Sequence, residues 1–249
     1  MTAWDVSDAV VLTAPASQLQ PGELTLSPEE SHHARVRRLA PGTTVHLVDG
    51  QGGRALAEIE GPRGPALRVR VLSVRHEPRP CPQVTLVQAL IKGDRAMAAV
   101  EMACEAGVDR IIPWQAERSV VRWRGPRAEQ SLAKWRSAVV SAGKQSRRSW
   151  FPDVEPVRTS AQLAQVLAGA DLALVLDAGA AMRLSAMSLP ERGSIVLVVG
   201  PEGGLSPGEI DTFVRAGAIT TRLGSPILRA GTAGVAALAV VMANSGRWD

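Results

Sequence analysis

The sequence predicts an α/β protein in which a small β-barrel domain precedes a domain with a mostly parallel sheet. Two patterns lead to this prediction. Between residues 9 and 75, short stretches of alternating polar and apolar residues are separated by turns rich in Gly and Pro, which is typical of a small barrel. From residue 83 onward, apolar strand-like runs alternate with helical patterns, which indicates a parallel sheet covered on both faces.

The N-terminal part is expected to consist of short strands. Alternation predicts strands at 44–48, 55–59 and 67–71. Turns are expected at 41–42, 49–53 and 61–65. Prolines 78, 80 and 82 then fall within Glu77–Pro82, a composition that predicts a stiff, extended linker. We therefore predict a barrel domain at 1–76, a linker at 77–82 and a second domain at 83–249.

The C-terminal part shows strand and helix signals in alternation. Buried strands are predicted at 84–90, 172–176 and 195–199, and further strands at 110–114 and 220–223. Helices are predicted at 94–106, 127–143 and 160–167, from 206 to Gly217, and from about Thr232 onward. The helix at 206 has the clearest start, because Ser206 and Glu209 match a capping box with Pro207 at the first helical position.

The composition excludes several protein classes. A chain of 249 residues with 45% hydrophobic and 21% charged residues can bury a core, which argues against disorder. The longest apolar run, at 230–243, is shorter than the ~18 residues of a membrane helix. Asp5 and Asp8, with no basic residue nearby, argue against a secretory signal. Cys81 and Cys104 match neither a disulfide scaffold nor a zinc site, so we expect no metal and a reducing cytoplasm.

The positive charge is concentrated in one segment. The whole chain has a net charge of +4, whereas residues 118–148 contain nine basic residues and Glu129 as the one acidic residue. The basic residues of this segment are Arg118, Arg122, Arg124, Arg127, Lys134, Arg136, Lys144, Arg147 and Arg148. Such a segment is typical of a surface that binds a polyanion.

Aromatic and imidazole side chains add to this picture. Four of the six Trp residues lie in or beside the basic segment, where they could stack on unpaired bases. Trp135 has the helical spacing of a core residue, whereas Trp123 fits a core role and an RNA role equally. All four His residues precede residue 77, so a reaction centre in the C-terminal part would have no histidine base. His32 and His33 lack a third ligand at metal-site spacing.

Two glycine-containing turns in the C-terminal part are the strongest candidates for a ligand site. The first follows a buried strand as Gly200-Pro201-Glu202-Gly203-Gly204, and the second is the segment 223–229. Ligands of open α/β sheets bind beyond the carboxyl ends of the strands. The first turn lacks the Lys and Ser/Thr of a triphosphate loop, and the Glu202 carboxylate would suit a cationic ligand better than a phosphate.

These turns belong to a set of ordered motifs along nearly the whole chain. The motifs are at 32–38, 49–50, 88–95, 105–108, 117–121, 145–148, 200–204 and 227–229. With these motifs the chain resembles the bacterial 16S ribosomal RNA (uracil-N3)-methyltransferase family, within the SPOUT superfamily of trefoil-knot methyltransferases. One departure is Gly231, where the family commonly has an acidic residue followed by Thr-Ala.

The resemblance implies a fold and a function. It implies a PUA-like N-terminal barrel, a knotted α/β domain that binds S-adenosylmethionine and releases S-adenosylhomocysteine, and a homodimer that methylates one uridine of 16S ribosomal RNA in the small ribosomal subunit. The cofactor-binding residues would be Leu176, Val199, Gly200, Pro201, Glu202, Gly203, Gly204, Leu223, Gly224, Ile227 and Leu228.

Arginines are the candidates for catalysis. The N3 proton of uracil has a pKa of ~10, by comparison with a phenol, so a fixed cation could stabilise the anion that forms. Arg229 and Arg118 are the catalytic candidates, with Arg148 as a further one; Arg118 could equally pair with Glu117 or Glu105. A capping or pairing role is favoured for Glu105, and Glu202 could bind cofactor, remain solvated or shape its loop.

RNA contacts are expected from a separate set of residues. They are Lys92, Arg122, Trp123, Arg124, Gln145, Arg147 and Arg148. Lys92 could equally be a surface lysine, and Gln145 could lack a partner. Two alternatives to uracil-N3 methylation remain at this point: a SPOUT enzyme that methylates ribose 2′-OH or guanine, and a non-catalytic RNA-binding protein.

Overall fold

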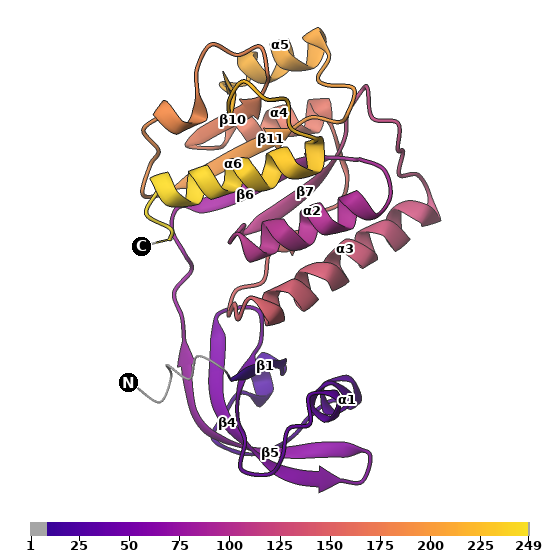
Figure 1. Ribbon diagram of the computed structural model, residues 1–249, viewed down its shortest axis with the longest axis vertical. Helices are drawn as coiled ribbons and strands as arrows, with labels where there is room; N and C mark the ends of the chain where they lie inside the picture. Colours follow the sequence, from indigo (N-terminus) through magenta and orange to yellow (C-terminus); the bar gives the residue numbers. More distant parts are fainter. Residues whose placement is uncertain (1–8, 249) are drawn as a thin grey trace. The chain divides into compact units, whose positions relative to one another are not determined.

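A computed structural model of the chain describes residues 9–248 (Figure 1). Asp5 and Asp8, which argued against a signal sequence, lie outside the described residues. The chain forms two compact units: the first comprises residues up to 79 together with 143–151, and the second comprises 80–142 together with 152–249. Among the described residues, no helix is long and apolar enough to cross a membrane.

The first unit is built on a five-stranded mixed sheet. Its strands are β1 (Val10–Thr13), β2 (Gly22–Thr25), β3 (Thr44–Val48), β4 (Gly53–Arg63) and β5 (Ala66–His76), in the order β1-β3-β4-β5-β2. β1 runs parallel to β3, and the other pairs are antiparallel. The predicted strand at 44–48 is confirmed, whereas β4 and β5 form a longer hairpin than predicted. Gly61, expected in a turn, lies within β4 at a shift of register with β5.

A helix in the first unit corrects the all-strand prediction. After a short 3-10 turn, η1 (Ala16–Gln18), and β2, α1 (Pro28–Val36) begins at Ser27, whose side chain accepts a hydrogen bond from the Glu30 N–H. Pro28 occupies the first helical position, where its missing N–H costs nothing. Ala34 is the one buried hydrophobic residue of this helix. The sequence therefore lacks the apolar residues at helical spacing that would have predicted it.

The segment 143–151 pairs with the turn between β3 and β4. The Phe151 N–H donates to the Gly50 carbonyl and the Gly52 N–H donates to the Ser149 carbonyl, both at 2.9 Å. The Phe151 ring lies so close to Gly50 that a Cβ built there would be 2.6 Å from it, and a Cβ on Gly143 would also clash with this ring. Glycine at both positions therefore allows the segment to pack within the first unit.

The second unit contains the predicted parallel sheet. Its strands are β6 (Gln83–Ala89), β7 (Arg110–Gln115), β8 (Asp153–Val154), β9 (Arg158–Thr159), β10 (Leu172–Leu176), β11 (Ser194–Val199) and β12 (Ile219–Thr221). The order is β12-β10-β11-β6-β7-β8, with β9 also paired to β7, and every pairing is parallel. The predicted α/β fold class with its mostly parallel sheet is thus confirmed.

Helices cover both faces of this sheet. They are α2 (Asp94–Glu105), α3 (Pro126–Gln145), α4 (Ser160–Ala168), the short 3-10 helix η2 (Leu184–Ala186), α5 (Pro207–Arg215) and α6 (Ala230–Asn244). The capping box of Ser206 and Glu209 at the start of α5 is confirmed. α6 begins at Ala230, two residues before the predicted start.

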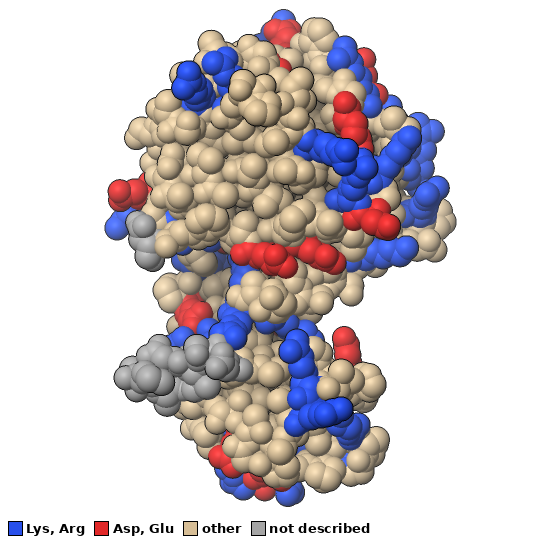
Figure 2. Space-filling view, in the orientation of Figure 1, with Lys and Arg blue, Asp and Glu red and all other residues tan. Residues whose placement is uncertain are grey.

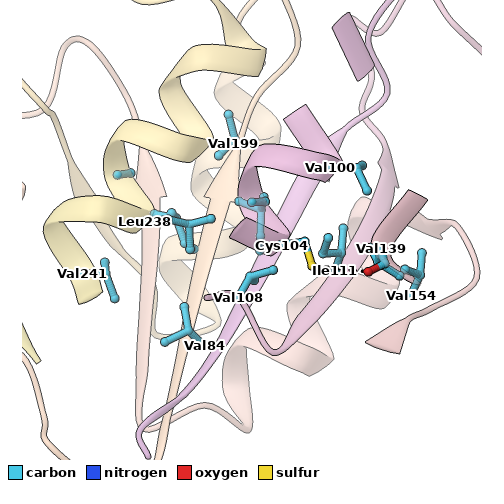
Figure 3. Packing of buried hydrophobic residues seen from close by; sticks show 14 of the residues in the cluster. Val84, Val100, Cys104, Val108, Ile111, Val139, Val154, Val199, Leu238 and Val241 are labelled. Atoms are coloured by element: carbon cyan, nitrogen blue, oxygen red, sulfur yellow. Dashed lines mark hydrogen bonds between the residues drawn. The ribbon is translucent and has the colours of Figure 1, made fainter. Parts of the chain in front are cut away.

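The hydrophobic core forms two layers because successive strand residues point to opposite faces. Val84 and Leu86 of β6 pack with α2, α3 and α6, whereas Val87 packs with Phe213 of α5 on the other face. Figure 3 shows the first layer, in which Leu238 and Val241 of α6 lie beside the sheet. Trp135 is 2% exposed, which confirms its predicted core position.

Candidate active site

A pocket of about 390 Å³ lies at the carboxyl ends of β10, β11 and β12. Because the three strands are parallel, the loops that follow them converge on one edge of the sheet. The loop after β11 supplies the glycine-rich turn, the loop after β12 supplies residues 222–229, and the first turn of α6 closes the pocket. The volume lies in the range of small-molecule sites.

Ten of the eleven residues predicted to bind a cofactor line this one pocket. They are Leu176, Val199, Gly200, Pro201, Glu202, Gly204, Leu223, Gly224, Ile227 and Leu228. The eleventh, Gly203, faces away, since a Cβ built on it would lie 3.2 Å from both Cβ and the carbonyl oxygen of Arg118. Gly203 therefore allows the glycine-rich turn to approach the loop that follows β7.

Several lining residues were missed by the sequence analysis. They are Asp177, Ala178, Leu205, Arg222, Pro226, Ala230 and Ala233. Asp177 directly follows β10, so the rule that ligands bind beyond the carboxyl ends of strands would have found it. Its side chain accepts a hydrogen bond from the Gly179 N–H at 3.2 Å.

The pocket contains charges of both signs. Glu202 and Asp177 contribute carboxylates, and Arg222 and Arg229 contribute guanidinium groups. Glu202 Oε1 accepts a hydrogen bond from the Lys92 N–H at 3.4 Å, which connects the glycine-rich turn to the end of β6. Two carboxylates in one pocket favour a ligand that itself has a positive charge.

Arg229 lies where α6 begins. It is the N-cap residue, and its carbonyl accepts hydrogen bonds from the N–H groups of Thr232 and Ala233. No side chain caps this helix end. The N-terminus of α6 therefore adds partial positive charge beside the Arg229 guanidinium, and both favour a negative charge at this side of the pocket.

Arg118 contacts the glycine-rich turn from outside the pocket. Its Nη1 donates to the Leu205 carbonyl at 3.1 Å and to the Gly203 carbonyl at 3.4 Å. Arg118 is not among the residues that line the cofactor-sized pocket. This geometry gives Arg118 a role in holding the turn, and its catalytic role stays a prediction.

Glu209 links three loops of the site, a role that the sequence showed only in part. The residue is 4% exposed. Its Oε1 accepts hydrogen bonds from the Glu117 N–H at 2.7 Å and the Ser160 hydroxyl at 3.0 Å, and its Oε2 accepts one from the Ser206 N–H at 3.0 Å. The loop that contains Arg118 is thereby fixed to the start of α5, directly after the glycine-rich turn.

The predicted RNA-contacting residues fall in both units. Figure 2 shows Lys and Arg side chains gathered on the side of the second unit where α3 lies. Arg122 and Arg124 are exposed in the loop before α3, and Arg122 Nη2 donates to the Glu117 carbonyl at 2.8 Å. Trp123 is half-buried, and its ring meets that of Trp135 edge to face with 5.1 Å between centroids. Lys92 is exposed at the end of β6.

Gln145, Arg147 and Arg148 belong to the segment that packs with the first unit. Arg147 has a left-handed backbone with φ of 59°, which ends α3, and the Arg148 N–H donates to the Gly143 carbonyl at 2.9 Å. Buried His46 lies nearby: burial, with Arg54 and Arg75 next in importance, lowers the pKa of its imidazole to about 4. This histidine is therefore neutral at physiological pH.

Gly231 points away from the pocket. A Cβ built on it would meet Ile91 Cδ1 at 3.4 Å and the Arg95 carbonyl at 3.5 Å, both ordinary contacts toward α2. A side chain at this position would therefore face α2. Among residues 9–248, no group of three or more His, Cys, Asp or Glu residues could hold a metal ion.

Comparisons with known proteins decide the family. A family model described as an RNA methyltransferase domain matches residues 77–242, and one described as an RNA methyltransferase PUA domain matches residues 26–72. The chain is 42% identical over 226 residues to ribosomal RNA small subunit methyltransferase E of Mycobacterium tuberculosis, which covers 89% of this chain and 86% of that protein. The chain belongs to the RNA methyltransferase family.

Further RNA methyltransferases are similar over most of their length. The Bacillus subtilis ribosomal RNA small subunit methyltransferase E is 30% identical, with 87% of this chain and 88% of that protein covered. The crystal structure of the Neisseria gonorrhoeae protein of the same name, bound to S-adenosylmethionine, matches with a TM-score of 0.84 and 29% identity over 94% of this chain and 97% of that chain. The family resemblance and the PUA-like N-terminal domain inferred from the sequence are confirmed.

Proposed function

We propose that this RNA methyltransferase transfers a methyl group from S-adenosylmethionine to N3 of one uridine in 16S ribosomal RNA of the small ribosomal subunit. The observation that supports this most is the pocket itself, in which the ends of two strands and two separate loops bring ten predicted residues around one volume of about 390 Å³. The names of the relatives support a small-subunit ribosomal RNA as substrate. The bound ligand of the Neisseria protein supports the cofactor.

The residues of the pocket fit S-adenosylmethionine. Apolar side chains of Leu176, Val199 and Leu228 offer a surface for the adenine ring, and the backbone at Gly200 can approach the ligand closely. The carboxylates of Glu202 and Asp177 would offset the positive charge of a sulfonium group. When bound, the cofactor supplies an electrophilic methyl group.

The chain's own residues would prepare the uracil for attack. Arg229, together with the N-terminus of α6, stabilises negative charge on the uracil as the N3 proton leaves. Arg118 and Glu209 hold the glycine-rich turn and the loop after β7 in one fixed arrangement. Orientation of the reacting groups can lower the activation free energy by ~7 kcal/mol or more in well-ordered sites. A site without a histidine base could therefore work by orientation and charge stabilisation.

We further propose that the working unit is a homodimer in the cytoplasm. Ile227, at the edge of the pocket, is 85% exposed, and Val120 is 68% exposed. Leu205, Pro207, Ile210 and Val214 line a groove on the same unit, together with Arg118 and Asp211. Exposed apolar residues grouped in one groove and bordered by charged ones are typical of protein contacts. A second copy covering them gives a dimer mass by light scattering, and a monomer at micromolar concentration would contradict this part of the proposal.

Nucleoside analysis tests the reaction. Purified protein is incubated with isotope-labelled S-adenosylmethionine and small ribosomal subunits from a strain without the gene, and the RNA is digested to nucleosides. We expect label in 3-methyluridine alone. Label in a 2′-O-methylated nucleoside or a methylguanosine would indicate a different RNA methyltransferase activity, and no label with intact RNA binding would indicate a binding protein.

A further inference from the structure

A second hollow, of about 560 Å³, adjoins the proposed cofactor pocket. It is lined by Ala178, Arg183, Ser185, Arg222, Leu223, Gly224 and Ser225. Four of these residues, Ala178, Arg222, Leu223 and Gly224, also line the cofactor pocket. The two spaces are therefore neighbours that share the turn following β12, and neither the sequence analysis nor the proposed reaction uses the second one.

Two arginines are held side by side in this hollow. Arg183 and Arg222 form an isolated parallel bridge, in which the Arg222 N–H donates to the Met182 carbonyl and the Leu184 N–H donates to the Arg222 carbonyl, both at 2.9 Å. Like charges at directly opposed positions of paired strands destabilise the pairing. The backbone therefore imposes a concentration of positive charge that a bound anion would relieve.

The two guanidinium groups form few hydrogen bonds or ion pairs with described residues. Arg222 Nη1 donates to the Ala180 carbonyl at 2.6 Å. Within residues 9–248, the Arg183 guanidinium has no hydrogen-bond or ion-pair partner. None of the described residues that line the hollow is acidic, whereas Asp177 and Glu202 both line the cofactor pocket. Arg222 lines both spaces, whereas Arg183 lines only the hollow without carboxylates.

The donors in the hollow match a phosphodiester. A guanidinium group presents paired N–H donors that fit two phosphate oxygens, and the hydroxyls of Ser185 and Ser225 can donate to others. Arg183, Ser185 and Ser225 are exposed, so the hollow is open enough to admit a polymer strand. Phosphate contacts of this type position an RNA strand without reading its sequence.

We propose that this hollow binds a backbone phosphate of the RNA strand next to the nucleotide that is methylated. The inference rests on the proposed function, because that function supplies an RNA substrate beside the cofactor. A phosphate fixed by Arg183 would set the distance between the strand and the methyl donor in the adjoining pocket. Arg183 would thus be a positioning residue, since it contacts the strand and not the reacting atoms.

Three variants of the full-length protein test the site by RNA binding. Arg183→Gln removes the charge, Arg183→Lys keeps the charge without the paired donors, and Arg192→Gln removes another exposed arginine and is the matched control. We expect Arg183→Gln to raise the Kd for 16S RNA by about two- to five-fold, the range for one exposed ion pair. The slope of log Kd against log salt should fall by about 0.7, as for one lost phosphate contact on a single strand.

The remaining outcomes separate this inference from the proposed function. Arg183→Lys should recover part of the affinity, Arg192→Gln should bind like wild type, and calorimetry should give the same S-adenosylmethionine affinity for all three. An equal loss in Arg192→Gln, or a loss of cofactor affinity in Arg183→Gln without loss of RNA affinity, would overturn the phosphate site. Wild-type protein that binds RNA but forms no 3-methyluridine would overturn the reaction and leave the phosphate site supported by the binding data.

Discussion

Three charged residues of the site have different roles: Arg229, Arg118 and Glu209. Arg229 lines the pocket at the start of α6, whereas Arg118 contacts carbonyls on the outer side of the glycine-rich turn. Glu209 is buried and accepts three hydrogen bonds from three different segments. The sequence named both arginines as catalytic candidates and favoured Arg229, and the fold now separates a residue that lines the pocket from one that holds the loop.

Replacement of Arg229 tests the charge in the pocket. Arg229→Ala should lower kcat by about 100-fold or more, the usual cost of a lost charge-stabilising group, because no other cation of α6 can replace it. The Kd for S-adenosylmethionine should change less than two-fold, since the backbone of the residue still caps α6. Single-turnover methylation and calorimetry measure the two quantities. Near-normal turnover would show that a group other than Arg229 stabilises the uracil anion.

Replacement of Glu209 tests the loop connection. Glu209→Ala leaves the Glu117 and Ser206 N–H groups and the Ser160 hydroxyl without their acceptor, and should reduce the free energy of unfolding by about 2–3 kcal/mol. Glu209→Gln keeps one oxygen acceptor and should lose less. Urea unfolding measures both. Equal losses in the two variants would contradict this, because the oxygen acceptor and the packing that Gln retains would then add nothing to stability.

At the scale of elements, the strands and helices of the second unit follow from local patterns. Apolar runs gave β6, β10 and β11 nearly to the residue, and the Ser-Pro-x-Glu pattern at 206–209 gave the start of α5. The same pattern occurs at Ser27–Glu30, but α1 lacks the apolar stripe that would have supported a helix there. The hollow around Arg183 and the contacts of Glu209 depend on pairings between distant segments, which periodicity does not contain.

Two helices have C-terminal ends in the first unit that are followed by a left-handed residue. Arg38 after α1 and Arg147 after α3 both have left-handed backbones, with φ of 54° and 59°. Glycine is favoured at such positions, and other residues cost ~1 kcal/mol. Arg38→Gly and Arg147→Gly should each increase the free energy of unfolding by up to about 1 kcal/mol. Thermal unfolding measures this gain, and a loss of stability in either would indicate that the arginine side chain holds its helix end.

The variants Arg38→Gly and Arg147→Gly also distinguish an effect on stability from an effect on RNA binding. Arg147 is among the predicted RNA-contacting residues, whereas Arg38 is not. Arg147→Gly should therefore weaken binding to 16S RNA several-fold, and Arg38→Gly should leave it near wild type. Equal RNA affinity of the two variants would remove Arg147 from the set of RNA contacts.

At the scale of the whole molecule, the positions of the histidines determine which unit changes stability with pH. All four precede residue 77, so histidine titration acts on the first unit. Burial lowers the pKa of His46 from 6.5 to about 4, with Arg54 and Arg75 adding to the effect and Glu77 opposing it. Burial, with Lys144 as the next cause, also lowers the pKa of His33. The folded unit therefore favours the neutral imidazole.

The free energy of unfolding should decrease as the pH falls. Between pH 6.5 and about 4 the unfolded chain binds a proton at His46 more readily than the folded chain. The contribution of His46 to the free energy of unfolding is therefore fully present above pH 6.5 and is lost as the pH falls toward 4. His46→Leu should flatten this part of the stability curve compared with wild type. Urea unfolding at pH 7.5, 6 and 4.5 measures it, and parallel curves for both proteins would exclude His46 as the cause.

The segment 143–151 has a consequence for attempts to express the PUA-like unit apart from the methyltransferase unit. Because this segment belongs to the first unit, the chain passes between the units three times, and the proline-rich stretch at 77–82 is not their single covalent connection. A gene fragment that stops there would lack the residues whose backbone pairs with Gly50 and Gly52 and whose Phe151 ring fills the space beside them. Domain-swapped chimaeras between relatives must therefore exchange two pieces of sequence, not one.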